Sequence, residues 1–233
     1  MTTTDDATPT PAGDAPRREI TPMSGVALLG AGVALLGAAG LFALVARRVA
    51  TKAAEPADQA LRDTVQARRS PVLDAAVKPV TLLSLPILVV AGTAALVWHL
   101  HRTGRRDAAV AIGITPVIAA IAGESFSTFL HQRNPPDAGD SPHGEVKEPS
   151  FPSGHTTGVT AEALAVAVIL WNEDLAPPRV LGALIAWPLL VGVTRVYRDR
   201  HWMSDILGGW AAGLTVAAAS SLIYGSLSRR EDG

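Results

Sequence analysis

The stretch SGVALLGAGVALLGAAGLFALVA, residues 24–46, decides the fold class, because it runs for 23 residues without a charged side chain. A helix of about 20 apolar residues is enough to cross the hydrocarbon core of a bilayer. The composition of the whole chain agrees, since 48% of its 233 residues are hydrophobic and only 18% are charged. We therefore predict an integral membrane protein built of helices, and the sequence excludes a water-soluble globule.

Further apolar segments follow, and together with the first they predict an all-α bundle of six transmembrane helices. They are residues 79–100, 108–130, 156–171, 180–194 and 206–227. Six spans place both ends of the chain on one side of the membrane. Residues 47–78 carry charges every few positions, which is typical of an amphipathic connector on the membrane surface, here broken at Pro56 and Pro71.

The domain organisation is simple. Residues 1–22 are rich in Thr, Pro, Asp and Ala, and we expect a disordered cytoplasmic tail. The apolar run after it exceeds the 7–15 residues usual for the core of a signal peptide, so cleavage is not expected. Residues 23–228 then form one membrane domain, and residues 229–233 form a short C-terminal tail.

The distribution of Lys and Arg among the loops predicts the orientation of the protein in the membrane only weakly. Eight Lys and Arg residues fall on the terminal side and seven on the other. The tight basic hairpin HLHRTGRR, residues 99–106, favours a cytoplasmic terminal side, because cytoplasmic loops are enriched in Lys and Arg. The opposite ends of the helices are then extracytoplasmic, in a multi-pass protein of the cell membrane.

Composition also removes several classes of function. The chain has no cysteine, which excludes disulfides, thiolate zinc sites and cysteine nucleophiles. Its net charge of −1 lacks the basic footprint of a nucleic-acid-binding domain. We expect the bilayer and a small substrate as partners, no nucleic acid and no metal, and the sequence leaves the oligomeric state open.

Polar side chains gather in residues 194–205, TRVYRDRHWMSD, at the edge of two predicted spans, where they cost free energy. His201 and Asp205 are four residues apart, so the carboxylate can reach one imidazole nitrogen and leave the other free as a nucleophile or base. Arg195 offers a planar, permanently charged fork that suits phosphate oxygens. The alternative is a solvated basic turn in which Asp205 is only a charge at a helix start.

A second polar cluster, PSGH at residues 152–155, directly precedes the span at 156–171. Backbone N–H groups near Gly154 at the helix start would bind an anion. Ser153 adds a hydroxyl donor, and His155 stands where it could protonate a departing oxygen. The alternative is an ordinary helix start with a Ser or Thr cap. Both clusters fall on the same predicted face of the membrane, so together they favour a site for phosphate chemistry.

These two motifs resemble those of the type 2 phosphatidic acid phosphatases, whose soluble relatives are the vanadium haloperoxidases. The second motif of that family, PSGH, is intact at residues 152–155. The third, Ser/Thr-Arg, five residues, His, three residues and Asp, is intact at Thr194, Arg195, His201 and Asp205. The resemblance extends over the six predicted spans.

The first motif of the family departs from its pattern. The family shows Lys, six residues and Arg-Pro ahead of PSGH, and Arg133 is the natural counterpart of that arginine. Phe126 stands seven residues before it, and an alignment on Pro136 instead puts Thr128 at the lysine position, so the lysine is missing in either case. Lys147 and Lys78 are candidates to replace its charge, and a solvated or snorkelling role is the commoner fate of a lysine.

The resemblance implies a metal-free mechanism without cofactors. His201, oriented by Asp205, would attack phosphorus and form a phosphohistidine, while His155 would protonate the leaving oxygen and later activate water. The equatorial phosphate oxygens would be held by Arg195, Arg133, Ser153 and the Gly154 amide.

The expected function is hydrolysis of a lipid phosphate, first of all a polyprenyl (undecaprenyl-type) diphosphate. Phosphatidate and phosphatidylglycerophosphate are the alternative substrates. A transporter or scaffold that kept the fold and lost catalysis is an alternative of another class. A serine hydrolase built on Ser153, His201 and Asp205 is a further rival, although the chain lacks a GxSxG-like turn around that serine.

Overall fold

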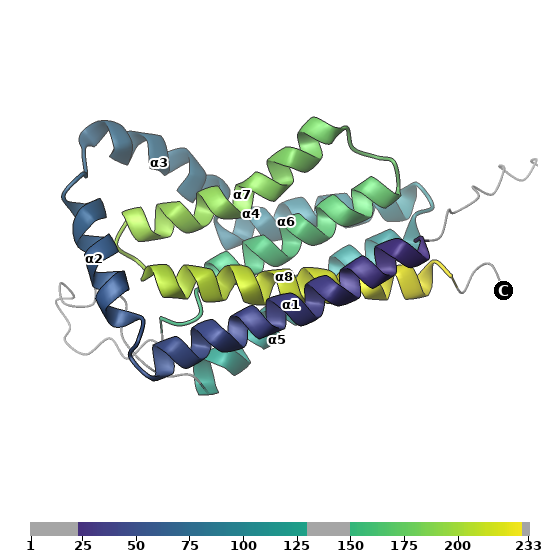
Figure 1. Ribbon diagram of the computed structural model, residues 1–233. Coiled ribbons are helices and arrows are strands. Elements are labelled where there is room, and N and C mark those ends of the chain that lie inside the picture. Colours follow the sequence, from purple (N-terminus) through teal and green to yellow (C-terminus); the bar gives the residue numbers. More distant parts are fainter. Residues whose placement is uncertain (1–22, 130–149, 230–233) are drawn as a thin grey trace, which may run out of the picture.

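The computed structural model describes residues 23–129 and 150–229, and within these ranges it contains helices and turns but no strand (Figure 1). The helices are α1 (Gly25–Ala50), α2 (Glu55–Gln66), α3 (Pro71–Leu83), α4 (Pro86–Arg102), α5 (Arg106–Phe129), α6 (Gly154–Asn172), α7 (Pro178–Tyr197) and α8 (Met203–Leu227). The predicted all-α class is therefore confirmed. The predicted tail at 1–22 and residues 230–233 lie outside the described ranges.

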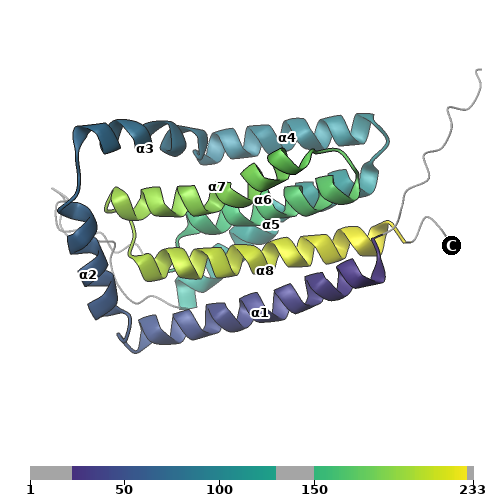
Figure 2. The same ribbon diagram turned by 45° about the horizontal axis from the view of Figure 1, so that its top comes forward.

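The long helices run side by side, and α2 crosses one end of the bundle, which we call the α2 end (Figure 2). At the opposite end, polar contacts tie the turns together. Arg105 Nε lies 3.2 Å from Glu173 Oε2, and the Tyr224 hydroxyl donates to Glu173 Oε1 at 2.7 Å. The Arg229 side chain donates to the Met23 carbonyl at 3.4 Å. The two described ends of the chain thus lie together, as an even number of spans requires.

The predicted number of spans is not confirmed by length and composition. Among the described residues, α1, α7, α8 and Arg106–Ser125 of α5 are long and apolar enough to cross a membrane. The pair α3 and α4 adds a fifth span if its two parts are taken together. The segment predicted at 156–171 forms α6 but is not among them, because its first half carries polar residues. These are Thr156, Thr157, Thr160 and Glu162.

The predicted span at 79–100 is also not one straight helix, because the chain bends by 45° between α3 and α4. Pro86 opens α4 and disfavours a helical conformation at Leu85, which has ψ 135°. Most of the connector expected at 47–78 forms α2 and the first half of α3, and the breaks expected at Pro56 and Pro71 coincide with the first turns of these two helices. A proline fits there because those N–H groups lack intrahelical acceptors.

Helix α8 lies at the centre of the bundle and packs closely against α6, which the small residues of its inner face permit. A Cβ atom added at Gly213 would lie 2.5 Å from Thr160 Cβ and 2.7 Å from the Thr157 carbonyl oxygen. At Gly209 it would lie 2.9 Å from Thr156 Cβ. These two glycines therefore set the distance between α6 and α8.

The outer surface of the bundle is apolar, in keeping with a multi-pass membrane protein. Large hydrophobic side chains face outward on several helices, including Val26 on α1, Ile87 on α4 and Leu189 on α7, which are 80%, 71% and 53% exposed. Such a surface is unfavourable in water over this extent and is matched by lipid chains.

The close approach of α6 and α8 predicts a difference between two glycine substitutions. Gly213→Ala should lower the melting temperature in detergent, because overpacking costs about 1–3 kcal/mol and exceeds the gain of roughly 0.5–1 kcal/mol from replacing a helical glycine. Gly37→Ala is the matched control, since a Cβ there has no neighbour within 4 Å. Thermal unfolding followed by tryptophan fluorescence tests this, and an equal gain from both substitutions would contradict the packing described.

Candidate active site

The turn between α7 and α8 brings the residues of the third motif together at the α2 end. Arg195 lies in the last turn of α7 and is half-buried. The chain then reverses through Asp199, which has a φ of 62°, and α8 begins at Met203. Thr194 is buried, and its hydroxyl donates to the Val191 carbonyl at 2.7 Å, so this threonine stabilises the end of α7 rather than facing a substrate.

Asp205 has no exposed surface and holds both the turn and the histidine. Its Oδ2 accepts a hydrogen bond from the Trp202 N–H at 2.9 Å, which caps the start of α8. The same oxygen lies 3.5 Å from His201 Nδ1. A carboxylate beside Nδ1 fixes the proton on that nitrogen and leaves Nε2 with a free lone pair. Nε2 of His201 is therefore the ring nitrogen that this contact leaves free.

Ser153 caps α6 and is fully buried. Its Oγ accepts from the Thr156 N–H at 3.3 Å, and its own N–H donates to the Asp205 carbonyl at 3.1 Å. The Ser153 backbone N–H is thus already used within the protein, while the hydroxyl keeps its proton for a further acceptor. Gly154 is exposed at the first position of the helix, where backbone N–H groups have no intrahelical acceptor.

The Ser153–Asp205 bond joins the two motifs directly. It links the start of α6 to the start of α8, and the contact at Gly209 keeps the two helices at backbone distance there. Both helices therefore present their N-terminal ends, which carry partial positive charge, at the same place. This arrangement favours an anion at the α2 end.

The second histidine of the predicted site, His155, contacts the bend between α3 and α4. Its Nε2 lies 3.1 Å from Ser84 Oγ, at the bend between α3 and α4. The charges of Arg195 and His201 both act on His155, so these two side chains lie near it. The structure thus brings together His155, Arg195 and His201, with Asp205 behind His201.

A cavity of about 490 Å³ begins at His155 and runs between α4, α5 and α6. Its walls include Ser84, Gly154 and Gly158, together with apolar side chains and two carboxylates, Glu124 and Glu162. A second cavity of about 230 Å³ shares Val89, Val159 and Glu162 with it and continues between α4, α6 and α7. The volume of the first cavity is within the range usual for ligand sites, and the mostly apolar lining of both suits a hydrocarbon chain.

Helix α2 covers the α7–α8 turn through charged side chains. Asp58, which is 4% exposed, accepts from the Ser204 N–H at 2.9 Å and from the Ser204 hydroxyl at 2.7 Å. Arg62 forms a two-point ion pair with Asp199, with Nε at 2.7 Å from Oδ1. The guanidinium also lies 6.0 Å from the ring centroid of Trp202. The turn that carries His201 is therefore held from outside as well as by Asp205.

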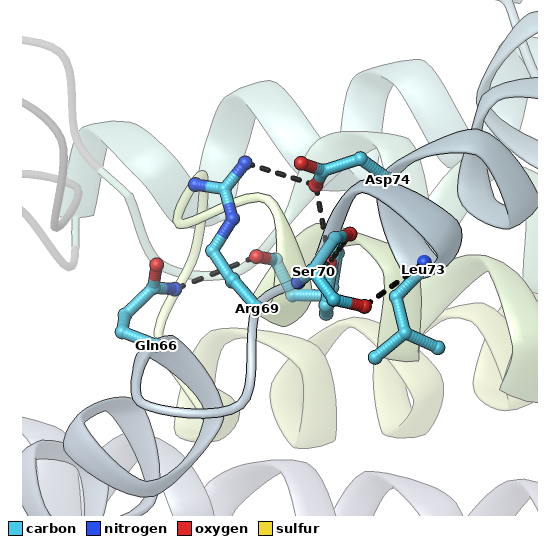
Figure 3. A network of polar contacts seen from close by, with 6 residues as sticks. Gln66, Arg69, Ser70, Leu73 and Asp74 are labelled. Atoms are coloured by element: carbon cyan, nitrogen blue, oxygen red, sulfur yellow. Dashed lines mark hydrogen bonds and ion pairs between the residues drawn. The ribbon is translucent and has the colours of Figure 1, made fainter.

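The corner between α2 and α3 holds the end of α7 in the same way (Figure 3). Asp74 Oδ1 accepts from Arg69 at 3.1 Å and from the Tyr197 hydroxyl at 3.0 Å. The Gln66 side chain donates to the Tyr197 carbonyl at 3.4 Å. Tyr197 follows Arg195 by two residues, so these contacts support the helical turn that carries the arginine.

One predicted site residue, Arg133, lies outside the described ranges, as does Lys147. Lys78, the other candidate for the missing charge, is exposed on α3, one turn after Asp74, and its charge acts on that carboxylate. Three residues that contact the site, Ser84, Asp58 and Arg62, were not predicted from the sequence. The charged connector at 47–78 was a signal for Asp58 and Arg62, because it is too polar for a span, whereas Ser84 lies in the apolar segment 79–100 and had no local signal.

The sequence is similar to known membrane phosphatases. The family model of the PAP2 superfamily matches residues 108–229. YbjG of Escherichia coli (strain K12), to which an undecaprenyl-diphosphatase activity is attributed, is 27% identical over 148 residues, covering 62% of this chain and 71% of YbjG. The lipid A 1-phosphatase of Rhizobium etli is 35% identical over 81 residues, which is 35% of this chain and only 32% of that enzyme.

A solved structure shows the same fold. The crystal structure of a transmembrane PAP2-type phosphatidylglycerolphosphate phosphatase from Bacillus subtilis superposes with a TM-score of 0.65 at 20% identity, covering 85% of this chain and 95% of that one. The family model spans more than half of the 233 residues and includes both intact motifs. The chain therefore belongs to the PAP2 superfamily, the type 2 phosphatidic acid phosphatase family that its motifs predict.

Proposed function

We propose that this lipid phosphatase hydrolyses a polyprenyl diphosphate of the undecaprenyl type, through a phosphohistidine and without a metal, at the extracytoplasmic face of the cell membrane. The observation that carries the proposal is the junction of the two motifs. The Ser153–Asp205 backbone bond and the His201–Asp205 contact place an oriented imidazole beside the start of α6. The charges of Arg195 and His201 also act on His155, which supports a common site.

The mechanism follows from these positions. Nε2 of His201 forms a bond to the terminal phosphorus as the bond from phosphorus to the bridging oxygen breaks. His155 gives a proton to that oxygen, and the polyprenyl phosphate leaves. His155 then takes a proton from water, the water oxygen bonds to phosphorus and the P–N bond breaks, which releases inorganic phosphate. Arg195, the hydroxyl of Ser153 and the Gly154 amide would stabilise the charge on the equatorial oxygens, together with Arg133.

The cavity next to His155 supports a lipid substrate. Its position between α4, α5 and α6 lets a chain lie beside the helices while the phosphate remains at the α2 end. Similarity to YbjG favours a polyprenyl diphosphate. Phosphatidylglycerophosphate or phosphatidate is the second candidate, favoured by the fold shared with the Bacillus subtilis phosphatase over most of both chains.

We further propose that all six long segments cross the membrane, with α3 and α4 acting as one bent span and α6 shielded by its neighbours. Eleven of the α6 residues are buried, so its threonines and Glu162 face protein and not lipid. The basic α4–α5 turn lies at the end opposite to His201, and the positive-inside rule then favours a site outside the cell.

The proposed chemistry predicts the effect of three histidine substitutions on phosphate release from undecaprenyl diphosphate. His201→Ala should reduce kcat by roughly a thousand-fold or more, because the nucleophile is lost, and His155→Ala by about 10²–10⁴-fold. His99→Ala, an exposed histidine at the opposite end, should change little. The purified protein should be assayed in EDTA with phosphatidate and phosphatidylglycerophosphate alongside. Wild-type inactivity on every lipid would instead support a scaffold or transporter.

The proposed orientation can be tested because the chain has no native cysteine. Arg68→Cys, in the turn between α2 and α3, should react with a membrane-impermeant maleimide on intact cells. His101→Cys, in the last turn of α4, should react only after permeabilisation. Both positions are exposed, so access of the reagent depends on the side of the membrane. The reverse labelling pattern would place the site on the cytoplasmic face.

If the lipid chain lies in the cavity next to His155, filling this cavity should impair the hydrolysis of lipid substrates selectively. A leucine at Gly158 would fill the cavity without a clash at Cβ, so Gly158→Leu should lower kcat/KM for undecaprenyl diphosphate by roughly ten-fold or more. Hydrolysis of p-nitrophenyl phosphate, which has no chain, should stay within about two-fold. Gly182→Leu, an equally open position on the outer side of α7, is the matched control. Equal losses on both substrates would place the lipid chain elsewhere.

A further inference from the structure

The bend between α3 and α4 brings Ser84 next to His155, the proposed general acid and base. Ser84 is the C-cap of α3, is 1% exposed, and lies 3.1 Å from His155 Nε2 through its Oγ. The two residues are 71 positions apart in the chain and both line the cavity. A buried hydroxyl at this distance from an imidazole acts on the proton position of the ring, and the mechanism above does not use it.

The direction of the Ser84–His155 hydrogen bond can be inferred from the other partner of the serine. Ser84 Oγ donates to the Thr81 carbonyl oxygen at 3.2 Å. That carbonyl belongs to the last turn of α3, where a helix leaves its carbonyl oxygens without backbone donors, so the hydroxyl proton has a favourable acceptor. The oxygen of Ser84 then presents a lone pair to His155, and Nε2 must carry the hydrogen.

We propose that Ser84 is a positioning residue that holds the His155 ring with its Nε2–H directed away from the substrate, so that Nδ1 is the nitrogen that exchanges protons during the reaction. The proposal rests on the phosphatase function argued above. In the first step the Nδ1–H bond breaks and the proton goes to the leaving oxygen. In the second step Nδ1 accepts a proton from the attacking water.

Rigidity of the surrounding chain makes this role effective. Ser84 stands between two helices whose bend is set by Pro86, so its hydroxyl is fixed by backbone geometry and not by a mobile loop. The hydrogen bond also strengthens when His155 is protonated, because charge-assisted bonds are stronger than neutral ones. Ser84 thus keeps the ring oriented in both the acid and the base state.

A series of leaving groups tests the proposal. The help of a general acid matters most for a poor leaving group, so Ser84→Ala should lower kcat/KM about ten- to a hundred-fold on a simple alkyl phosphate. On p-nitrophenyl phosphate, whose leaving group needs little protonation, the loss should stay within about three-fold. The readout is the slope of log kcat/KM against the pKa of the leaving group, since kcat/KM covers the steps up to departure of that group.

Control variants separate positioning from stability. Ser84→Thr keeps the hydroxyl and should show the same slope as the wild type. Ser220→Ala removes a buried hydroxyl that bonds to Thr115 at 2.9 Å deep in the bundle, and it should leave the slope unchanged. If the alanine variant does not fold, Ser84→Cys keeps the volume with a weak hydrogen-bonding group and should steepen the slope in the same way.

The outcomes are distinct from those that test the function itself. An equal loss on every leaving group, or no loss at all, would overturn the role of Ser84 while leaving the phosphatase intact. A wild-type protein that releases no phosphate from any ester, or full activity of His201→Ala, would instead overturn the proposed function.

Discussion

The buried carboxylate of Asp205 is the interaction on which the rest of the α2 end depends. A fully buried charge is costly unless donors surround it, and here one side-chain oxygen caps α8 and contacts His201 while the backbone carbonyl receives the Ser153 N–H. One residue therefore fixes the start of a helix, the orientation of an imidazole and the distance between two motifs. The close packing of α6 on α8 helps to exclude solvent from Asp205.

Around this centre the protein adds a second set of constraints from outside the bundle. Asp58 and Arg62 of α2 hold the turn between α7 and α8, and Asp74 of α3 holds the last turn of α7. Each bond joins residues more than 120 positions apart in the chain. A single ion pair at a surface contributes little alone, but this ion pair and the two hydrogen bonds act on residues 197–204 and restrict the motion of this segment together. The connector helices thus serve as structural support for the site.

Much of this arrangement could be predicted from the sequence. The uncharged run at 24–46 marks a helix by composition alone, and the prolines at 56 and 71 mark the points where the connector breaks. The spacing of His201 and Asp205 predicts their contact, although His201 lies just before the start of α8 and not on a helical turn. What could not be predicted depends on tertiary contact. Nothing local in the sequence shows that Ser84 meets His155 or that Asp58 meets Ser204. The apolar segment at 79–100 conceals a bend, because hydropathy does not report direction, and the polar first half of α6 weakens the count of spans.

The glycines and alanines on the inner face of α8 have a consequence for how this sequence can diverge. Where helices touch through backbone atoms, almost any larger side chain collides, so α8 has very few acceptable replacements. The outward face of α1 meets only open surroundings at Gly30, Gly32 and Gly37 and accepts many apolar residues. Among relatives, the residues of α1 should therefore vary widely. The side-chain volumes in α8 should stay nearly constant, even at positions far from any reacting atom.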